Sequence, residues 1–202
     1  MSDPAEPGDR SGARPRVLVI TGPSGVGKGT LIQEILRRFP ELQLAVSATT
    51  RRPRSGEVDG RDYHFLAPEE FDRRIRAGDF LEYADYAGNR YGTLRSEVER
   101  APGGVVLEIE VQGARQVREA MPEAVLVFIA PPSPQALRQR LIGRGTDSPE
   151  EIARRLRQAD EELRAQDEFQ HVIVNDALGR ASAELSDLVA TIWPRPDRAA
   201  ER

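Results

Sequence analysis

The amino-acid sequence predicts an α/β fold in which helices cover both faces of a parallel sheet. Short β-branched runs at residues 17–20, 105–110, 125–130 and 171–174 have the composition of strands buried on both faces. Segments with a helical spacing of apolar residues alternate with these runs. Strands that alternate with helices favour a parallel sheet between two helical layers.

Helices are expected in five places along this alternation. The first follows a glycine-rich turn, has its apolar stripe within residues 31–39 and ends at Pro40. The others are expected near residues 112–120, 134–142, 149–166 and 181–193. Ser148 and Glu151 form a predicted capping box for the longest of them, with Pro149 in its first turn.

Residues 47–93 depart from the alternation because they are polar, rich in arginine and aromatic. The pair Gly88-Asn89 predicts a turn between Tyr86 and Tyr91. We expect an inserted lobe of short antiparallel strands with one helix near residues 69–77. The two ends, residues 1–15 and 194–202, are predicted to be tails, since residues 1–15 lack the apolar side chains needed to offset the cost of ordering.

Composition excludes several classes of site. A net charge of -4 gives no general attraction to nucleic acid or to anionic membranes, so a site for a polyanion has to be a local cluster of arginines. The absence of cysteine excludes disulfides, thiolate metal sites and cysteine nucleophiles. No segment matches a secretory signal or is long and apolar enough to span a bilayer, so a cytoplasmic location is expected.

A phosphate-binding loop follows the first strand. Glycines let backbone N–H groups converge on an oxyanion, the start of the following helix adds positive potential, and a lysine reaches the outer phosphates. Of the 29 basic residues, Lys28 is the sole lysine. Gly29 occupies the position after the lysine where such loops usually carry Ser or Thr. The hydroxyl of Thr30, one residue later, is therefore expected to face Mg²⁺, partly through water. The residues predicted to bind the phosphates of a donor nucleotide in this loop are Gly22, Pro23, Ser24, Gly25, Val26, Gly27, Lys28, Gly29 and Thr30.

A cluster of guanidinium and phenol groups in the middle segment predicts a second anion site. Arg51 and Arg54 lie three residues apart, with Tyr63 and Tyr91 within plausible reach. Such groups together can hold a dianionic monophosphate. The alternative interpretation is a solvated basic loop.

With the segments 47–57, 60–65, 80–83, 91–93, 128–133, 140–146 and 172–176, the chain resembles guanylate kinase from about residue 17 to residue 193. The resemblance implies an α/β, three-layer P-loop kinase fold with a parallel central sheet, an inserted mixed α/β nucleotide-monophosphate lobe and a helical lid. The implied core comprises residues 16–46, 94–138 and 156–193, the GMP-binding lobe residues 47–93, and the lid residues 139–155. The implied activity is Mg²⁺-dependent transfer of the γ-phosphoryl group of ATP to GMP, giving ADP and GDP, in purine nucleotide metabolism.

The resemblance also implies roles for single residues. Glu82 would accept hydrogen bonds from guanine N1–H and the exocyclic amine, with the hydroxyls of Ser47 and Thr93 toward O6. Arg140, Arg144 and Arg155 would be lid arginines that act in catalysis with Lys28 and Arg51. Asn175 and Asp176 would border the adenine of ATP, at the end of a strand.

Three questions stay open from the sequence. Glu108 and Glu110 stand where guanylate kinases usually carry aspartates, and one of them is expected to face hydrated Mg²⁺ or the acceptor nucleotide. A non-catalytic interaction module and a kinase for another monophosphate are competing functions; the intact loop argues against the first, and Glu82 and Ser47 against the second. We interpret His64, His171 and Trp193 as structural. The oligomeric state is not predicted.

Overall fold

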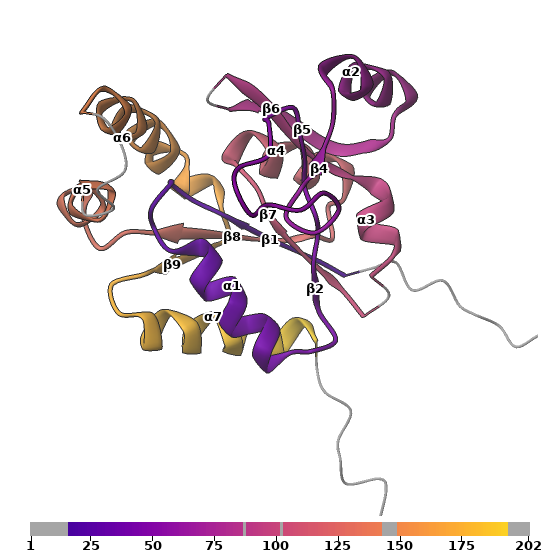
Figure 1. Ribbon diagram of the computed structural model, residues 1–202. Coiled ribbons are helices and arrows are strands. Elements are labelled where there is room, and N and C mark those ends of the chain that lie inside the picture. The colour runs from indigo at the N-terminus through magenta and orange to yellow at the C-terminus, as the bar shows by residue number, and fades with distance from the viewer. Residues whose placement is uncertain (1–15, 87, 102, 143–148, 194–202) are drawn as a thin grey trace, which may run out of the picture.

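A five-stranded parallel sheet forms the centre of the protein (Figure 1). The computed structural model describes residues 16–86, 88–101, 103–142 and 149–193. The strand order is β2-β7-β1-β8-β9. These strands are β1 (Val17–Thr21), β2 (Gln43–Leu44), β7 (Val105–Glu108), β8 (Val125–Ala130) and β9 (His171–Val174). The predicted parallel sheet is confirmed.

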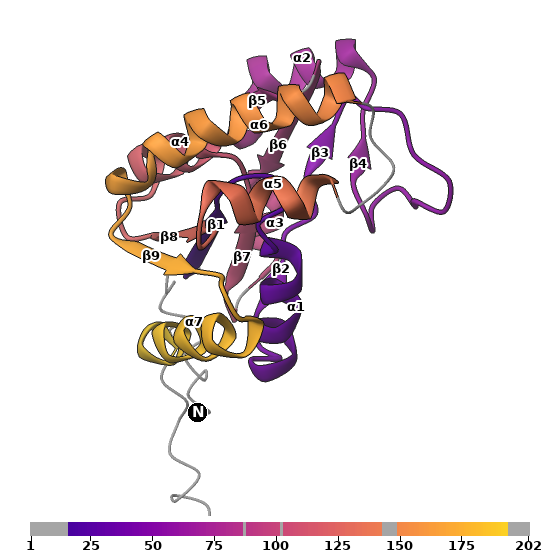
Figure 2. The ribbon, with the colours of Figure 1, turned by 90° about the vertical axis from the view of Figure 1, so that its left-hand side faces the viewer.

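Helices pack on both faces of this sheet (Figures 1 and 2). They are α1 (Lys28–Arg38) and α7 (Leu178–Ile192) on one face, and α3 (Arg95–Glu99) and α4 (Val111–Ala120) on the other. Alternate side chains of β1 pack on opposite faces of the sheet, because successive residues of a strand point in opposite directions. Leu18 and Ile20 belong to the apolar cluster with α1 and α7, whereas Val17 and Val19 belong to the cluster with α3 and α4. The expected three layers are therefore present.

Residues between the first and second halves of the sheet form a separate four-stranded sheet of order β4-β3-β6-β5. Its elements are β3 (Ala48–Thr49), β4 (His64–Phe65), α2 (Pro68–Ala77), β5 (Phe80–Tyr86) and β6 (Asn89–Leu94). Phe71 of α2 packs in a small apolar core with Ala48, Phe80 and Leu94. The expectation of antiparallel strands alone is wrong, since β3 and β4 run parallel. The long loop 50–63 returns the chain to the same end of β3 before β4 begins.

Two further helices lie beside the carboxyl ends of the central strands (Figure 2). They are α5 (Pro134–Ile142) and α6 (Pro149–Arg164), and a single 3-10 turn, η1 (Gln166–Glu168), follows α6. Leu137, Leu141 and Ala159 join them to the cluster of α1 and α7. The predicted cap Ser148 and the predicted lid residue Arg144 lie outside the described residues.

Some predicted boundaries differ from the structure. The strand expected over residues 105–110 ends at Glu108, because the chain turns at Glu110, which precedes the first residue of α4. The helix expected from residue 181 begins three residues earlier, at Leu178. Its first three residues are exposed, so the buried apolar stripe that predicted the helix starts only at Ala181. The helix expected to reach residue 166 ends at Arg164. Neither β2 nor α3 was predicted; both are too short to show a periodicity.

Candidate active site

The glycine-rich turn between β1 and α1 folds around the ammonium group of Lys28. Gly22 and Gly27 have positive φ angles of 134° and 101°. A Cβ atom on Gly22 would lie 2.3 Å from the carbonyl oxygen of Ile129, so only glycine fits there. Nζ of Lys28 donates a hydrogen bond to the carbonyl oxygen of Gly22 at 2.6 Å, and the residue is 9% exposed. The loop therefore holds a buried positive charge at the start of α1, where oxyanions bind favourably.

Side chains from α5 and from the end of β9 support this loop from behind. Nδ2 of Asn175 donates to the carbonyl oxygen of Val26 at 2.8 Å. Arg140 donates to the carbonyl oxygens of Val26 at 3.1 Å and Asn175 at 2.9 Å. Asp176 is exposed and forms an ion pair with Arg180. Arg140 and Asn175 thus brace the loop backbone, a contribution that the sequence did not predict.

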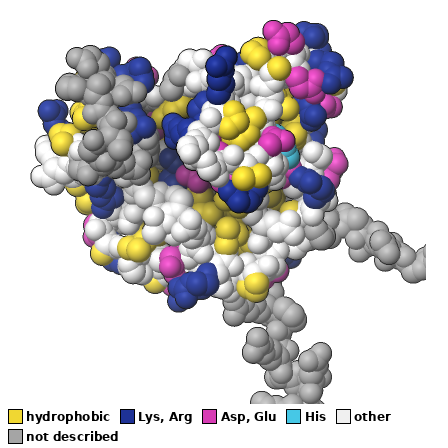
Figure 3. Space-filling model, in the orientation of Figure 1, with side chains coloured by type: hydrophobic (Ala, Val, Ile, Leu, Met, Phe, Trp, Pro, Cys, Tyr) yellow, Lys and Arg dark blue, Asp and Glu magenta, His cyan; other side chains and the backbone are white. Residues whose placement is uncertain are grey.

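A cavity of about 480 Å³ joins the loop to the second sheet. Residues of the phosphate-binding loop, the central sheet, the lobe and α6 line it. The residues that line it are Ser24, Gly25, Gly27, Lys28, Gly29, Thr30, Leu44, Ala45, Ser47, Arg51, Arg54, Asp62, Tyr63, Glu82, Ala84, Tyr86, Tyr91, Gly92, Glu108, Ile109, Glu110 and Arg155. In the space-filling view a notch is open on this side, and Lys and Arg side chains gather along it (Figure 3). A second hollow of about 520 Å³, between α1 and α7, contains none of the predicted site residues.

Arg51 is held in one orientation at the lobe side of the cavity. Its guanidinium donates to both carboxylate oxygens of Glu57, at 2.9 and 2.8 Å. The guanidinium also lies over the ring of Tyr63, 5.2 Å from its centroid. The hydrogen bonds to Glu57 raise the pKa of Arg51 further and lower the pKa of Glu57. A fixed, fully charged fork of this kind suits bidentate binding of a phosphate.

Glu82 is a buried carboxylate on the wall of the same cavity. It is 3% exposed, and its Oε1 accepts a hydrogen bond from the hydroxyl of Thr93 at 2.7 Å. Burial raises the pKa of Glu82 to about 7, against the hydrogen bonds from Thr93. A Cβ atom on Gly113 would lie 2.2 Å from Oε2 of Glu82, so α4 packs directly on the carboxylate. The position of Glu82 is therefore set from two elements.

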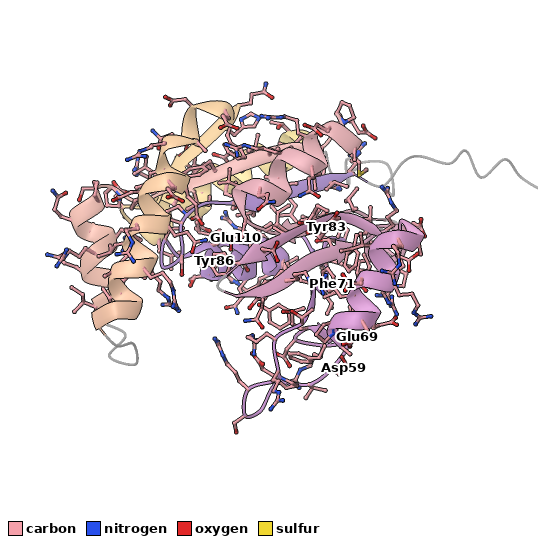
Figure 4. The ribbon with its side chains drawn as sticks, turned by 90° about the horizontal axis from the view of Figure 1, so that it is seen from above. Asp59, Glu69, Phe71, Tyr83, Tyr86 and Glu110 are labelled. Atoms are coloured by element: carbon pink, nitrogen blue, oxygen red, sulfur yellow. The ribbon has the colours of Figure 1, made fainter. Side chains whose placement is uncertain are left out.

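A second group of acids lies where the central sheet, the lobe and α6 meet. Glu110 and Glu162 of α6 are close enough to interact, and the Oε2 atom of each carboxyl group is buried without a hydrogen-bond partner. Burial and the neighbouring Glu110 raise the pKa of Glu162. Tyr86 lies beside Glu110 (Figure 4), and burial raises its pKa to about 12. Burial also raises the pKa of Glu108, although Lys28 opposes this shift.

Comparisons with known proteins agree with this geometry. A family model described as guanylate kinase matches residues 14–192. The chain is 57% identical to a guanylate kinase of Synechococcus sp. (strain CC9311), over 88% of this chain and 94% of the relative. It is 53% identical to a guanylate kinase of Streptomyces coelicolor, over 89% of this chain and 93% of the relative.

A solved structure is similar over most of its length as well. The crystal structure of guanylate kinase from Anaplasma phagocytophilum superposes with a TM-score of 0.72 at 31% identity, covering 90% of this chain and 87% of that one. The chain belongs to the guanylate kinase family.

Most of the residues predicted for a guanylate kinase site line one cavity, although they come from distant parts of the chain. Thr93 bonds to Glu82 and lies outside the cavity lining. Arg140, Asn175, Asp176 and three loop residues also lie outside the lining. These loop residues are Gly22, Pro23 and Val26.

Four residues that matter to the site were not predicted. Glu57 orients Arg51, Gly113 admits the carboxylate of Glu82, and Tyr86 and Glu162 surround Glu110. Glu57 follows Arg51 by six residues in the same basic loop, which was a usable signal for a local ion pair. Glu162 lies on the apolar side of α6, three residues after Ala159. The sequence alone does not show that its carboxyl group is buried, because the burial depends on the elements that pack against α6. Among the described helices, none has the length and apolarity needed to cross a membrane.

Proposed function

We propose that the chain transfers the γ-phosphoryl group of ATP to GMP, giving ADP and GDP, in the cavity between the phosphate-binding loop and the lobe. The observation that carries this proposal is the shared cavity itself. Lys28 lies at one end of it, and Arg51 and Glu82 at the other. A donor phosphate at the loop and an acceptor phosphate at Arg51 would therefore face each other without a barrier of protein between them.

The donor end of the cavity has the groups that a triphosphate requires. The loop N–H groups and the start of α1 favour an oxyanion, and Lys28 can exchange its bond to the Gly22 carbonyl for one to the outer phosphates. Arginine would not replace it, because a planar fork is too wide for the loop. The contacts of Asn175 and Asp176 with adenine remain predictions. In this structure the side chain of Asn175 bonds to the carbonyl oxygen of Val26 in the loop.

Mg²⁺ fits the donor end by the chemistry of its oxygen donors. The hydroxyl of Thr30 and the carboxylate of Glu108 line the cavity beside Lys28. Oε2 of Glu108 lies 3.9 Å from the position of a Cβ atom on Gly29, so this carboxylate reaches the loop next to Thr30. Thr30 would hold the ion, partly through water, because Mg²⁺ prefers oxygen ligands and retains much of its hydration. When bound with ATP, the ion would neutralise phosphate charge.

The acceptor end has separate groups for phosphate and base. Arg51, Arg54, Tyr63 and Tyr91 would bind the GMP phosphate. Glu82, supported by Thr93, would accept hydrogen bonds from guanine N1–H and the exocyclic amine, and Ser47 would supply a hydroxyl toward O6. Adenine places an acceptor at its N1, so a carboxylate would repel it. Glu108 and Glu110 also line this cavity, and we assign both to the acceptor side. Glu108 also interacts with Lys28, so it would border the hydrated ion at the donor end as well.

The transfer itself requires alignment and charge neutralisation. The attacking oxygen belongs to a phosphate that is already largely ionised near neutral pH, so no general base is needed. Lys28, Arg51 and Arg155 line the cavity and can converge on the transferred group. Arg140 would contribute through the loop that it braces, and Arg144 is expected to join from the lid. Closure of lobe and lid would exclude water as a competing acceptor.

The test is formation of ADP in a coupled assay with GMP, AMP, CMP and UMP in turn. We expect turnover with GMP and at least about 10³-fold lower kcat/KM with AMP. Equal rates with AMP would contradict the assignment of Glu82 to guanine. No turnover with any of the four would favour a non-catalytic interaction module. A cytoplasmic location remains a prediction from the sequence.

A further inference from the structure

A buried carboxylate lies outside the cavity, at the junction between the two sheets. Glu97 of α3 is 7% exposed and is absent from the cavity lining. Its Oε2 accepts a hydrogen bond from the backbone N–H of Val46 at 3.1 Å, and its Oε1 lies 2.9 Å from Nε2 of His64. Arg100 pairs with it from the exposed side. Burial of a charge is costly, so each of these partners is needed to keep the carboxylate in place.

The contact with Val46 falls where the chain leaves the central sheet. The N–H of Ala45 still donates to the carbonyl oxygen of Val106, at 3.0 Å. The next strand, β3, begins only at Ala48. Between the sheets the N–H of Val46 has no strand partner, and Glu97 supplies the acceptor. The carboxylate therefore fixes the backbone at the crossing from the core into the lobe.

The contact with His64 fixes the same crossing from the other side. The backbone N–H of His64 donates to the carbonyl oxygen of Ser47 at 2.9 Å. Glu97, Val46, Ser47 and His64 thus form a closed ring of one peptide link and three hydrogen-bonded contacts. Ser47 is the member of this ring that lines the cavity. Its backbone is held on both sides by groups that depend on Glu97.

We propose that Glu97, through Val46 and His64, is a positioning residue for Ser47 in the acceptor site. The inference rests on the proposed function, because Ser47 matters only if the cavity binds GMP. It assigns Glu97 and His64 a part in GMP recognition, although neither side chain touches the cavity. The loop and Lys28 belong to other elements, so ATP binding is independent of this ring.

Steady-state kinetics of Glu97→Ala, Glu97→Gln and Glu99→Ala test the proposal. Glu99 is an exposed carboxylate of the same helix and serves as the matched control. We expect Glu97→Ala to raise the KM for GMP about tenfold while the KM for ATP stays within about twofold. Glu97→Gln keeps a carbonyl acceptor for Val46, so its KM for GMP should lie within about threefold of the unaltered chain. An equal rise of both KM values in Glu97→Ala would indicate general damage and overturn the proposal.

A double-mutant cycle with Ser47→Ala tests the path. If Glu97 acts through Ser47, Glu97→Ala adds little to the KM for GMP in the Ser47→Ala background. Fully additive effects would overturn the proposal. If Glu97→Ala does not fold, the same cycle is run with His64→Leu, which removes the other arm of the ring. Absence of GMP turnover in the unaltered chain would overturn the proposed function as well, whereas normal turnover with additive variants would overturn only the role of Glu97.

Discussion

The hydroxyl of Thr93 donates to the carboxylate of Glu82 at 2.7 Å, across the paired strands β5 and β6. This bond orients a carboxylate that is almost fully withdrawn from water. A buried acid retains its proton to a higher pH than an exposed one, because burial penalises the charged form. The recognition of guanine should therefore depend on pH in a way that reports on this pair.

Binding of GMP should weaken as the pH falls through the pKa of Glu82, which burial raises to about 7. Protonation removes the acceptor for guanine, so the KM for GMP should rise about tenfold from about pH 8 to about pH 6. Glu82→Gln cannot titrate and should lose that part of the pH dependence, together with most of the preference for GMP over AMP. The variant also controls for titration of the GMP phosphate. The same pH profile in both proteins would contradict this assignment.

Substitution of Gly113 should disturb the acceptor site by steric contact alone. A Cβ atom there would lie 2.2 Å from Oε2 of Glu82, so Gly113→Ala has to displace the carboxylate. We expect the KM for GMP to rise by about tenfold or more, with the KM for ATP unchanged. Gly179→Ala in α7 is the matched control, since a Cβ atom meets nothing within 4 Å there. A Gly113→Ala enzyme with an unaltered KM for GMP would show that Glu82 has room to move.

Glu57→Gln should weaken GMP binding although Glu57 is not proposed to touch the nucleotide. The change replaces one charged acceptor of the Arg51 fork, so the guanidinium loses its fixed orientation. A rise in the KM for GMP of about three- to tenfold is expected. Glu69→Gln, at an exposed position at the far end of the lobe (Figure 4), should leave the KM unchanged. A lower KM in Glu57→Gln would mean that Glu57 competes with the phosphate instead.

Stability should fall as the pH rises because of Glu162. Its pKa is raised above the ordinary 4.5 to about 8. The folded state therefore binds the proton of Glu162 more tightly than the unfolded state does. The stability that this proton contributes is present at low pH and is lost as the pH rises toward the raised pKa. Thermal unfolding between about pH 6 and about pH 9 should show a smaller decrease of Tm for Glu162→Gln than for the unaltered chain. Glu161→Gln, one residue away and exposed, should follow the unaltered chain. Parallel curves for all three proteins would exclude this role for Glu162.

Lys28→Arg should abolish most of the activity while the positive charge is retained. The ammonium lies inside the loop, 2.6 Å from the Gly22 carbonyl oxygen, and a planar guanidinium has no space to adopt that position. We expect kcat to fall by about 10²-fold or more. Circular dichroism would establish that the variant is folded. Retention of normal kcat would show that charge alone is sufficient at this position.

The sequence predicted those parts of the fold that carry a pattern of their own. The strands β8 and β9 begin and end where the apolar runs do, and the loop before Lys28 follows from the spacing of its glycines. The strands β2, β3 and β4 have two residues each, and such short segments show no alternation. Their pairing depends on neighbours distant in the chain, which periodicity cannot report.

The candidate site shows the same division. Arg51 and Glu82 were named from the segments that contain them, but their supports were not. Glu57, Gly113 and Glu162 act by contacts with side chains on other elements, so their importance is visible only after folding. Arg140 was named as a lid residue, and its bonds to the loop backbone could not be inferred from its position in a helix.

The ring around Glu97 has an evolutionary consequence. Since Glu97 follows the lobe in the chain and bonds to Val46, which precedes it, the lobe enters and leaves the core at neighbouring points. A segment with ends so close together can be exchanged for another without a change in the central sheet. The choice of acceptor can then diversify while the donor machinery is inherited intact. In this architecture, replacement of one insertion can change the acceptor site while the central sheet and the phosphate-binding loop stay the same.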